Sequence, residues 1–186
     1  MVSVTLGWLG TILYLLAHAW LSLLKNKATY HYYLANLVAA ILVATSSYLI
    51  ASWQAVVINV FWALVSFAAM KNYVLPRLPF SNAQLYGLLG VMFLAGAGGL
   101  LFAYAQQGMA ILAWSSSIAY CLGYWRFSAG RLSQQSYYLV NTYAAVMLLP
   151  QLYTDANWPV LVLQIVWASV SLWGWYKGRE GYVLSP

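Results

Sequence analysis

Charge is what this sequence has least of. Two acids and eight lysines or arginines make only 5% of the 186 residues charged, whereas about a quarter of the residues of a typical soluble protein are charged. With 64% hydrophobic residues and a mean hydropathy of +0.75, the composition predicts an integral membrane protein. The net charge of +6 is spread thinly between apolar runs, which argues against a nucleic-acid partner.

The shortage of cysteine and acids excludes several kinds of chemistry. Cys121 is the single cysteine, so an intrachain disulfide is excluded, and it has no Cys or His neighbour at metal-ligand spacing. The two acids, Asp155 and Glu180, fall in a link and in the tail, away from the apolar spans. The spans contain no Ser-His-acid set, paired carboxylates or Gly-rich phosphate loop. We therefore expect a protein that is not an enzyme and holds no metal or cofactor.

Seven apolar stretches are long enough to cross a bilayer, which takes about 20 residues of helix. They are residues 4–24, 32–50, 53–70, 84–105, 109–124, 137–153 and 158–176. The links between them are short and polar, so none of them is a soluble domain. The sequence predicts an all-α fold with seven transmembrane helices.

Every lysine and arginine falls on one side of the membrane when alternate links are assigned to opposite sides. They are Lys25, Lys27, Lys71, Arg77, Arg126, Arg131, Lys177 and Arg179. Basic residues near helix ends stay in the cytoplasm, so the pattern predicts an N-terminus outside and a C-terminus in the cytoplasm. Short loops of this kind are typical of a bacterial inner (plasma) membrane protein.

The chain contains an internal repeat at an offset of 105 residues. The aligned pairs include Tyr32 with Tyr137, Asn36 with Asn141, Tyr48 with Tyr153, Trp53 with Trp158 and Trp62 with Trp167. One residue of slippage also aligns Tyr14 with Tyr120. The repeat predicts three segments: a first three-helix repeat (1–70), a linker with the fourth helix (71–108), and a second three-helix repeat with the cytoplasmic tail (109–186). The linker helix makes the two repeats parallel.

The linker helix is rich in glycine. Its glycines are Gly87, Gly90, Gly96, Gly98 and Gly99. Small residues allow helix backbones to approach closely within a membrane. We expect close packing at these positions.

A polar stripe on the third helix of each repeat is the first candidate site. Its members are Asn59, Trp62 and Ser66 in the first repeat and Gln164, Trp167 and Ser171 in the second. The i, i+3, i+7 spacing puts each set on one helix face. An amide in hydrocarbon needs partners, so these faces should point to the bundle interior. They either contact a substrate or tie the helices together.

Further polar residues fall inside other spans. Tyr14 and Tyr120 occupy the middle of the first helix of each repeat, where their hydroxyls need partners and can line a cavity. His18 follows Tyr14 by one turn and is either a cavity residue or a satisfied core histidine. Asn36 and Asn141 lie nearer the cytoplasmic end, where they form an inner gate or bond to neighbouring backbone.

The plan of three, one and three helices with paired polar positions resembles the sugar-transporting SWEET and PQ-loop superfamily and the Pnu-type vitamin transporters. The residues that carry the resemblance are Asn59 with Trp62 and Gln164 with Trp167. It implies that residues 59 and 164 face the sugar, although Gln164 departs from the family's asparagine. The family's hinge prolines are missing, since Pro159 only opens the seventh span and Pro150 is the one proline within the interior of a predicted span. Small uncharacterised membrane proteins of that group are also similar, through the segments 7–10 and 59–62.

Two functions remain open. The first is a facilitator that carries a small neutral or zwitterionic ring-containing metabolite, such as a sugar, nucleoside or vitamin, by alternating access around a central pocket between the repeats. The second is a non-transporting receptor or sorting and assembly protein, because the KDEL-receptor group also resembles this plan. The expected partners are the lipid bilayer and a small-molecule substrate, and the chain can also form a homo-oligomer.

Overall fold

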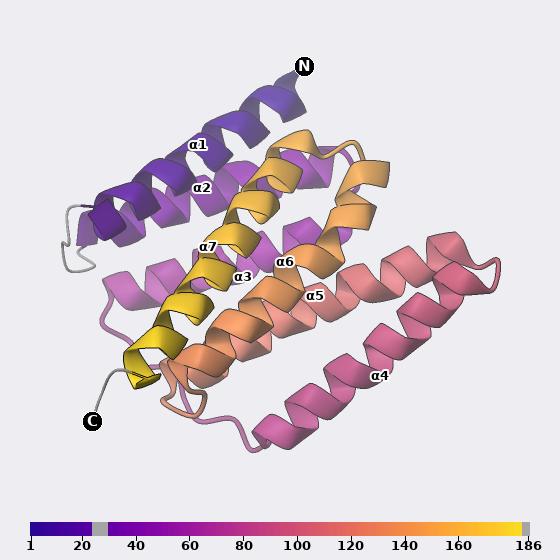
Figure 1. The fold of residues 1–186 in the computed structure, drawn as a ribbon. Coiled ribbons are helices and arrows are strands. Elements are labelled where there is room, and N and C mark those ends of the chain that lie inside the picture. The colour runs from indigo at the N-terminus through magenta and orange to yellow at the C-terminus, as the bar shows by residue number, and fades with distance from the viewer. Residues whose placement is uncertain (24–29, 184–186) are drawn as a thin grey trace. The chain divides into compact units, whose positions relative to one another are not determined.

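The computed structural model describes residues 1–23 and 30–183, which fold into helices only (Figure 1). The seven helices of the described residues are α1 (Val2–Leu23), α2 (Tyr30–Leu49), α3 (Trp53–Met70), α4 (Asn82–Leu101), α5 (Ala105–Ser128), α6 (Gln134–Thr154) and α7 (Trp158–Val183). Lys25 and Lys27, which carry the first basic link, lie outside the described residues, as do the side chains of Arg179 and Glu180. The predicted all-α fold of seven helices is confirmed.

Among the described residues, five helices are both long and apolar enough to cross a membrane: α1, α2, α3, α4 and α7. The other two, α5 and α6, have 24 and 21 residues and are long enough, but they are less apolar. Part of that polarity is buried, because Ser115, Ser116 and Asn141 all face the protein interior. Polar side chains that face other helices are compatible with a lipid-facing exterior. The chain is a multi-pass, all-helical membrane protein.

The structure corrects the predicted boundary between the fourth and fifth helices. Residues 106–108 were expected to form a link, yet they belong to the first turn of α5. The chain reverses one turn earlier, at Ala103, whose φ of +68° is left-handed. The two helices can meet so tightly because Gly99 and Gly108 face each other. A Cβ on Gly99 would lie 2.9 Å from the Cα of Gly108.

Arg126 is not a link residue, as the sequence pattern predicted, but a buried residue of α5. Its Nε donates to Asn82 Oδ1 at 2.6 Å, its Nη1 donates to the carbonyl of Phe80, and its guanidinium lies 5.0 Å from the Phe80 ring centroid. These contacts hold the start of α4, where Ser81 and Gln84 also form a capping box. A long arginine fork satisfies several backbone and amide oxygens at once.

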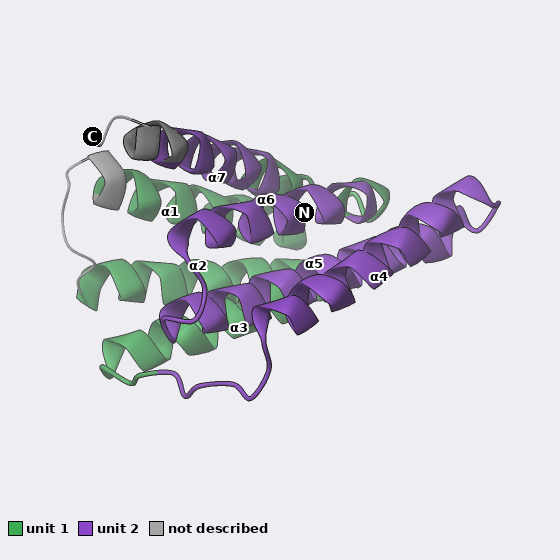
Figure 2. Ribbon diagram, turned by 60° about the horizontal axis from the view of Figure 1, so that its bottom comes forward, with its two compact units in different colours: residues 1–74, 152–163 green, residues 75–151, 164–186 purple. Residues whose placement is uncertain are grey.

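Two compact units make up the chain (Figure 2). The first contains Met1–Val74 with Leu152–Leu163, and the second contains Leu75–Gln151 with Gln164–Pro186. In the first unit α2 packs against both α1 and α3, and in the second α4 packs along α5. The first unit therefore holds the whole first repeat together with the turn between α6 and α7.

The α2–α3 and α6–α7 turns have the same backbone. Ala51 and Ala156 occupy equivalent positions and have left-handed φ angles of +57° and +51°. In both turns the next residue donates its N–H to the carbonyl five residues earlier, at 2.9 Å. This is the bond that closes a Schellman-type helix end. The repeated sequence thus encodes the same helical hairpin twice.

An aromatic pair brackets each of these turns. Tyr48 and Trp53 meet edge to face with ring centroids 5.6 Å apart, and Tyr153 and Trp158 do the same at 5.4 Å. Edge-to-face pairs of this kind add stability beyond their buried area. The sequence repeat is therefore matched contact by contact at the turns.

The linker glycines only partly fulfil the packing expected of them. Added Cβ atoms on Gly96 and Gly99 would clash with Leu112 and Gly108 of α5. Those on Gly87, Gly90 and Gly98 would meet no atom within 4 Å. The prediction of close packing is wrong for these last three. They lie on a face of α4 that no described residue covers at that distance.

Candidate functional site

The first candidate site joins α1 to α3 in the first unit. The hydroxyl of Tyr14 donates to Asn59 Oδ1 at 3.3 Å, and both side chains are buried. The amide nitrogen of Asn59 donates to the carbonyl of Ala55, one turn back on its own helix, at 2.8 Å. The structure thus brings together the tyrosine and the amide that the sequence singled out separately. Each satisfies part of the other's need for a partner inside the bundle.

His18 extends this network towards α2. Its Nδ1 lies 2.9 Å from the carbonyl of Tyr14, and its Nε2 lies 2.9 Å from the hydroxyl of Tyr32. A carbonyl only accepts, so Nδ1 must carry the proton, and a neutral ring then accepts from Tyr32 at Nε2. Both ring nitrogens have partners. The geometry matches the satisfied core histidine rather than an open cavity residue.

The second candidate site joins α5 to α7 in the second unit. The hydroxyl of Tyr120 donates to Gln164 Oε1 at 2.5 Å, and both side chains are buried. No described residue accepts a hydrogen bond from the amide nitrogen of Gln164. In this respect the second site differs from the first, where Asn59 commits its nitrogen to its own helix. Gln164 therefore retains a hydrogen-bond donor that no described residue uses.

The two gate candidates make different contacts. Asn36 donates to the carbonyl of Tyr32 on its own helix at 2.8 Å. Asn141 reaches across to α7, where its amide nitrogen lies 3.5 Å from the hydroxyl of Ser171. Asn36, Asn141 and Ser171 are all buried. Bonding to neighbouring backbone, one of the two roles considered for these residues, is what Asn36 does.

The remaining members of the polar stripes differ in burial. Ser66 is buried beside Val65, whereas the indoles of Trp62 and Trp167 are only half-buried. The Trp62 ring meets the ring of Phe61, its neighbour in sequence, edge to face at 6.1 Å. Within each stripe the amide and the serine are thus more deeply placed than the tryptophan.

Sequence reasoning missed a polar cluster at the α6–α7 turn, which belongs to the first unit. Ser52 donates to Asp155 Oδ2 at 2.6 Å, and Asn157 donates through its amide nitrogen to Ser47 at 3.1 Å. The cluster ties the two equivalent turns to each other. An acid two residues before an asparagine, in a chain almost without acids, was the available signal.

Sequence reasoning also missed the serines at the start of the second repeat. Ser116 donates to the carbonyl of Ala144 on α6 at 2.6 Å, and Ser115 lies 2.8 Å from the hydroxyl of Tyr143 on the same helix. Three serines in a row within an apolar span were the signal for a polar helix interface.

Comparison with known proteins identifies one relationship. A family model matches residues 3–77 and 109–180, which leaves out the segment 78–108 around α4. No curated protein and no solved structure matches the chain. The two matched segments together cover more than half of the residues, so the chain belongs to this uncharacterised family.

Proposed function

We propose that this protein is a facilitator that carries a small neutral or zwitterionic ring-containing metabolite, such as a sugar, nucleoside or vitamin, across the membrane by alternating access. The proposal rests on the hydrogen bonding of the Gln164 amide group. The residue as a whole is 5% exposed, its amide oxygen accepts a hydrogen bond from Tyr120, and its amide nitrogen donates to no described residue. That nitrogen is not sealed inside the protein, because the fully buried polar atoms without a partner among the described residues are Gln135 Oε1 and Asn157 Oδ1. A ligand hydroxyl or carbonyl would satisfy the Gln164 nitrogen.

The surroundings of the amides favour an uncharged substrate. Each amide oxygen accepts from a tyrosine hydroxyl, and both ring nitrogens of His18 have hydrogen-bond partners. Among the described residues, no charged side chain forms a hydrogen bond with Asn59 or Gln164, so no fixed charge beside the amides would select an ion. Small-molecule sites usually combine apolar and aromatic walls with a few placed polar groups. Tyrosine rings beside amide groups fit a sugar or a heterocyclic ring in this way.

We also propose the orientation of the chain, with the N-terminus outside, the C-terminus in the cytoplasm and a bacterial inner membrane as the location. The distribution of lysine and arginine supports it. Single cysteines placed in a Cys121→Ser background test it. A membrane-impermeant maleimide should label Tyr104→Cys in intact cells and Arg77→Cys only after permeabilisation. The reverse labelling would overturn the orientation.

The second candidate, a non-transporting receptor or assembly protein of the same fold, is favoured by one specific observation. Both amide oxygens are engaged by a tyrosine of the same repeat. That is the arrangement expected of ties between helices. Interhelical hydrogen bonds of this kind contribute about 0.6 kcal/mol on average in membranes. On this alternative the amides have no ligand.

The deciding experiment measures ligand-dependent thermal stability, followed by uptake into proteoliposomes. A panel of sugars, nucleosides and vitamins is tested on the wild type, Gln164→Ala and Tyr120→Phe. Ser169→Ala is the matched control, because Ser169 lies exposed on the same helix and bonds only to its own backbone at Ile165. A bound ligand raises apparent stability by mass action.

The two functions predict different patterns among these variants. For a transporter, one class of ligand stabilises the wild type, Ser169→Ala and Tyr120→Phe, while Gln164→Ala loses the effect and at least tenfold of the uptake rate. For a non-transporting protein, no ligand stabilises the wild type. Gln164→Ala and Tyr120→Phe are then both simply less stable, and the transport proposal is wrong.

A further inference from the structure

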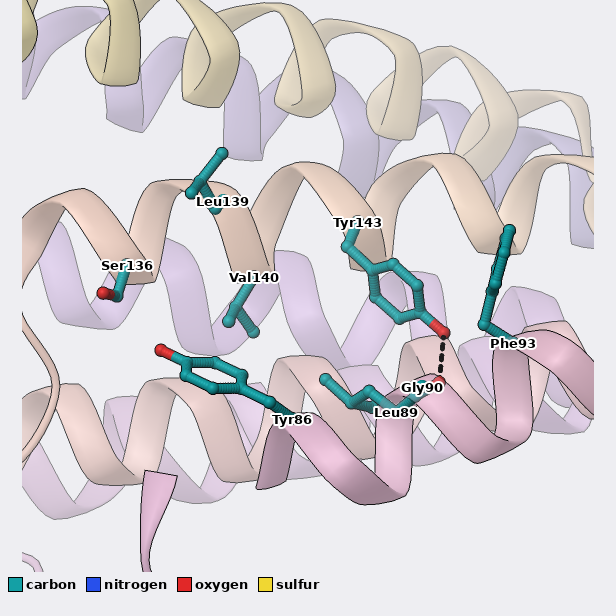
Figure 3. A pocket seen from close by; sticks show the side chains of 8 residues that line it. All are labelled: Tyr86, Leu89, Gly90, Phe93, Ser136, Leu139, Val140 and Tyr143. Atoms are coloured by element: carbon teal, nitrogen blue, oxygen red, sulfur yellow. Dashed lines mark hydrogen bonds between the residues drawn. The ribbon is translucent and has the colours of Figure 1, made fainter. Parts of the chain in front are cut away.

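A groove lies between α4 and α6 in the second unit, with a volume of about 510 Å³ (Figure 3). Its lining residues are Tyr86, Leu89, Gly90, Phe93, Ser136, Leu139, Val140 and Tyr143. Of the five apolar helices, α4 buries the smallest share of its residues, so this side of the unit is open to the surroundings. In a multi-pass membrane protein the surroundings of an open apolar groove are lipid.

The groove is polar at one end and apolar along the rest. Figure 3 shows the hydroxyls of Tyr86 and Ser136 pointing towards the same end, with Phe93 at the opposite end. The hydroxyl of Tyr143 is already engaged, because it donates to the carbonyl of Leu89 at 3.3 Å. Apolar carbon therefore forms the walls between the two ends.

Gly90 leaves the groove open along α4. A Cβ added at Gly90 would meet no atom within 4 Å. From Tyr86 to Phe93 the lining spans about two helical turns, or roughly 10 Å. A slot of that length with apolar walls can hold part of a hydrocarbon chain.

The backbone of one exposed arginine lies near the polar end of the groove. Asn82, one turn before Tyr86, donates to the backbone carbonyl of Arg131 at 3.0 Å, and Arg131 itself is exposed. Ser136 lies in the first turn of α6, where its N–H donates to the hydroxyl of Ser133. Backbone N–H groups at a helix start add to the attraction for an anion. The start of α6, two hydroxyls and the backbone of an exposed arginine thus lie near the end where the apolar groove begins.

We propose that this groove binds an anionic phospholipid of the surrounding bilayer, with an acyl chain along Leu89, Gly90 and Val140 and the phosphate near Arg131. Charge complementarity at the polar end distinguishes this occupant from a purely apolar partner. The site is separate from the tyrosine–amide pairs, and the proposal does not depend on transport.

Native mass spectrometry of the purified protein with phosphatidylglycerol, phosphatidylcholine or inorganic phosphate tests the proposal. Gly90→Phe fills the groove, and Gly98→Phe is its control, since Gly98 is equally open on the same helix but does not line the groove. The wild type and Gly98→Phe should retain phosphatidylglycerol in preference to phosphatidylcholine. Gly90→Phe should retain at least tenfold less, and Arg131→Gln should lose the preference between the two lipids.

Several results would overturn the proposal. Gly90→Phe could retain as much lipid as the wild type, or the wild type could show no preference for phosphatidylglycerol. Inorganic phosphate could bind as tightly as the lipid. A dimer that Gly90→Phe dissociates would make the groove an interface between copies of the chain instead. Gly90→Leu places a smaller side chain in the groove and should also reduce the retention of phosphatidylglycerol at least tenfold. If neither filler folds, the lipid preference of the wild type and its loss in Arg131→Gln decide the matter.

Discussion

The two repeats build the same tie with different amides. In the first, Tyr14 donates to Asn59 at 3.3 Å, and in the second, Tyr120 donates to Gln164 at 2.5 Å. The glutamine side chain is one methylene longer than the asparagine side chain, and in each repeat the amide oxygen accepts from the tyrosine of that repeat. Asn59 is short enough for its nitrogen to bond back to its own helix, whereas Gln164 is not used in that way. The two amides thus differ in their nitrogen: that of Asn59 has an acceptor, and that of Gln164 has none among the described residues.

The contact between the first and second helices of each repeat differs in a related way. Gly10 of α1 faces α2 so closely that a Cβ there would lie 2.9 Å from the carbonyl of Ala39. Ser116 occupies the equivalent place on α5, and its hydroxyl donates to the equivalent carbonyl, that of Ala144, at 2.6 Å. One repeat brings its helices together by removing a side chain and the other by a hydrogen bond. Equivalent positions therefore need not tolerate the same residues.

The largest expected effect comes from breaking the glycine contact. Gly10→Val should lower the free energy of unfolding by about 3 kcal/mol, the upper end for an overpacked core. The added carbons would meet Val43 at 2.7 Å as well as the Ala39 carbonyl. Gly98→Val, on the open face of α4, is the control and should change stability little. Denaturation in mixed micelles measures both, and an unaffected Gly10→Val would refute the close approach.

The matching change in the second repeat should cost less. Ser116→Ala removes one buried hydrogen bond and keeps the helix spacing, so we expect a loss of about 1 kcal/mol. The same denaturation experiment measures it. A loss as large as that of Gly10→Val would mean that the two contacts do not differ in the way described.

Removing the tyrosine hydroxyl should destabilise the second repeat more than the first. Tyr120→Phe leaves the Gln164 oxygen without its short bond and should lower the free energy of unfolding by about 1 kcal/mol, while Tyr14→Phe should lower it by about half as much. The reason is that Tyr120 makes the one side-chain hydrogen bond that Gln164 has within the described residues, whereas Asn59 keeps its bond to Ala55. Thermal melts of both variants give the comparison, and a larger loss for Tyr14→Phe would contradict it.

Substitutions at the two left-handed alanines should have a small effect on stability that is equal in both repeats. Unlike the variants above, they should raise stability. Ala51→Gly and Ala156→Gly each relieve a left-handed alanine and should raise stability by roughly 0.5–1 kcal/mol. Ala113→Gly, in the helical and buried part of α5, is the control and should lower stability. Unequal gains in the two turns would show that the repeated backbone is not equally strained.

The sequence predicted the fold well because a bilayer imposes strong rules on it. The bounds of α3 agree with the apolar stretch 53–70 residue for residue, and each repeat was visible as recurring side chains. The start of α5 was missed because hydropathy does not register the left-handed turn at Ala103. Arg126 was misplaced because a charge near a span end looks like a loop residue, whereas its partners lie far away in sequence on Phe80 and Asn82.

Composition and pattern alone determined that the chain is a seven-helix membrane protein with two related halves, because the cost of exposing polar backbone and charge to hydrocarbon leaves few alternatives. They also determined which amides and tyrosines had to find partners. Only the tertiary structure decided which partner each one found: Tyr14 with Asn59, Tyr120 with Gln164, and His18 with Tyr32. Hydrogen bonds depend on distances of a few tenths of an ångström between side chains on different helices, and no spacing along the chain specifies these distances.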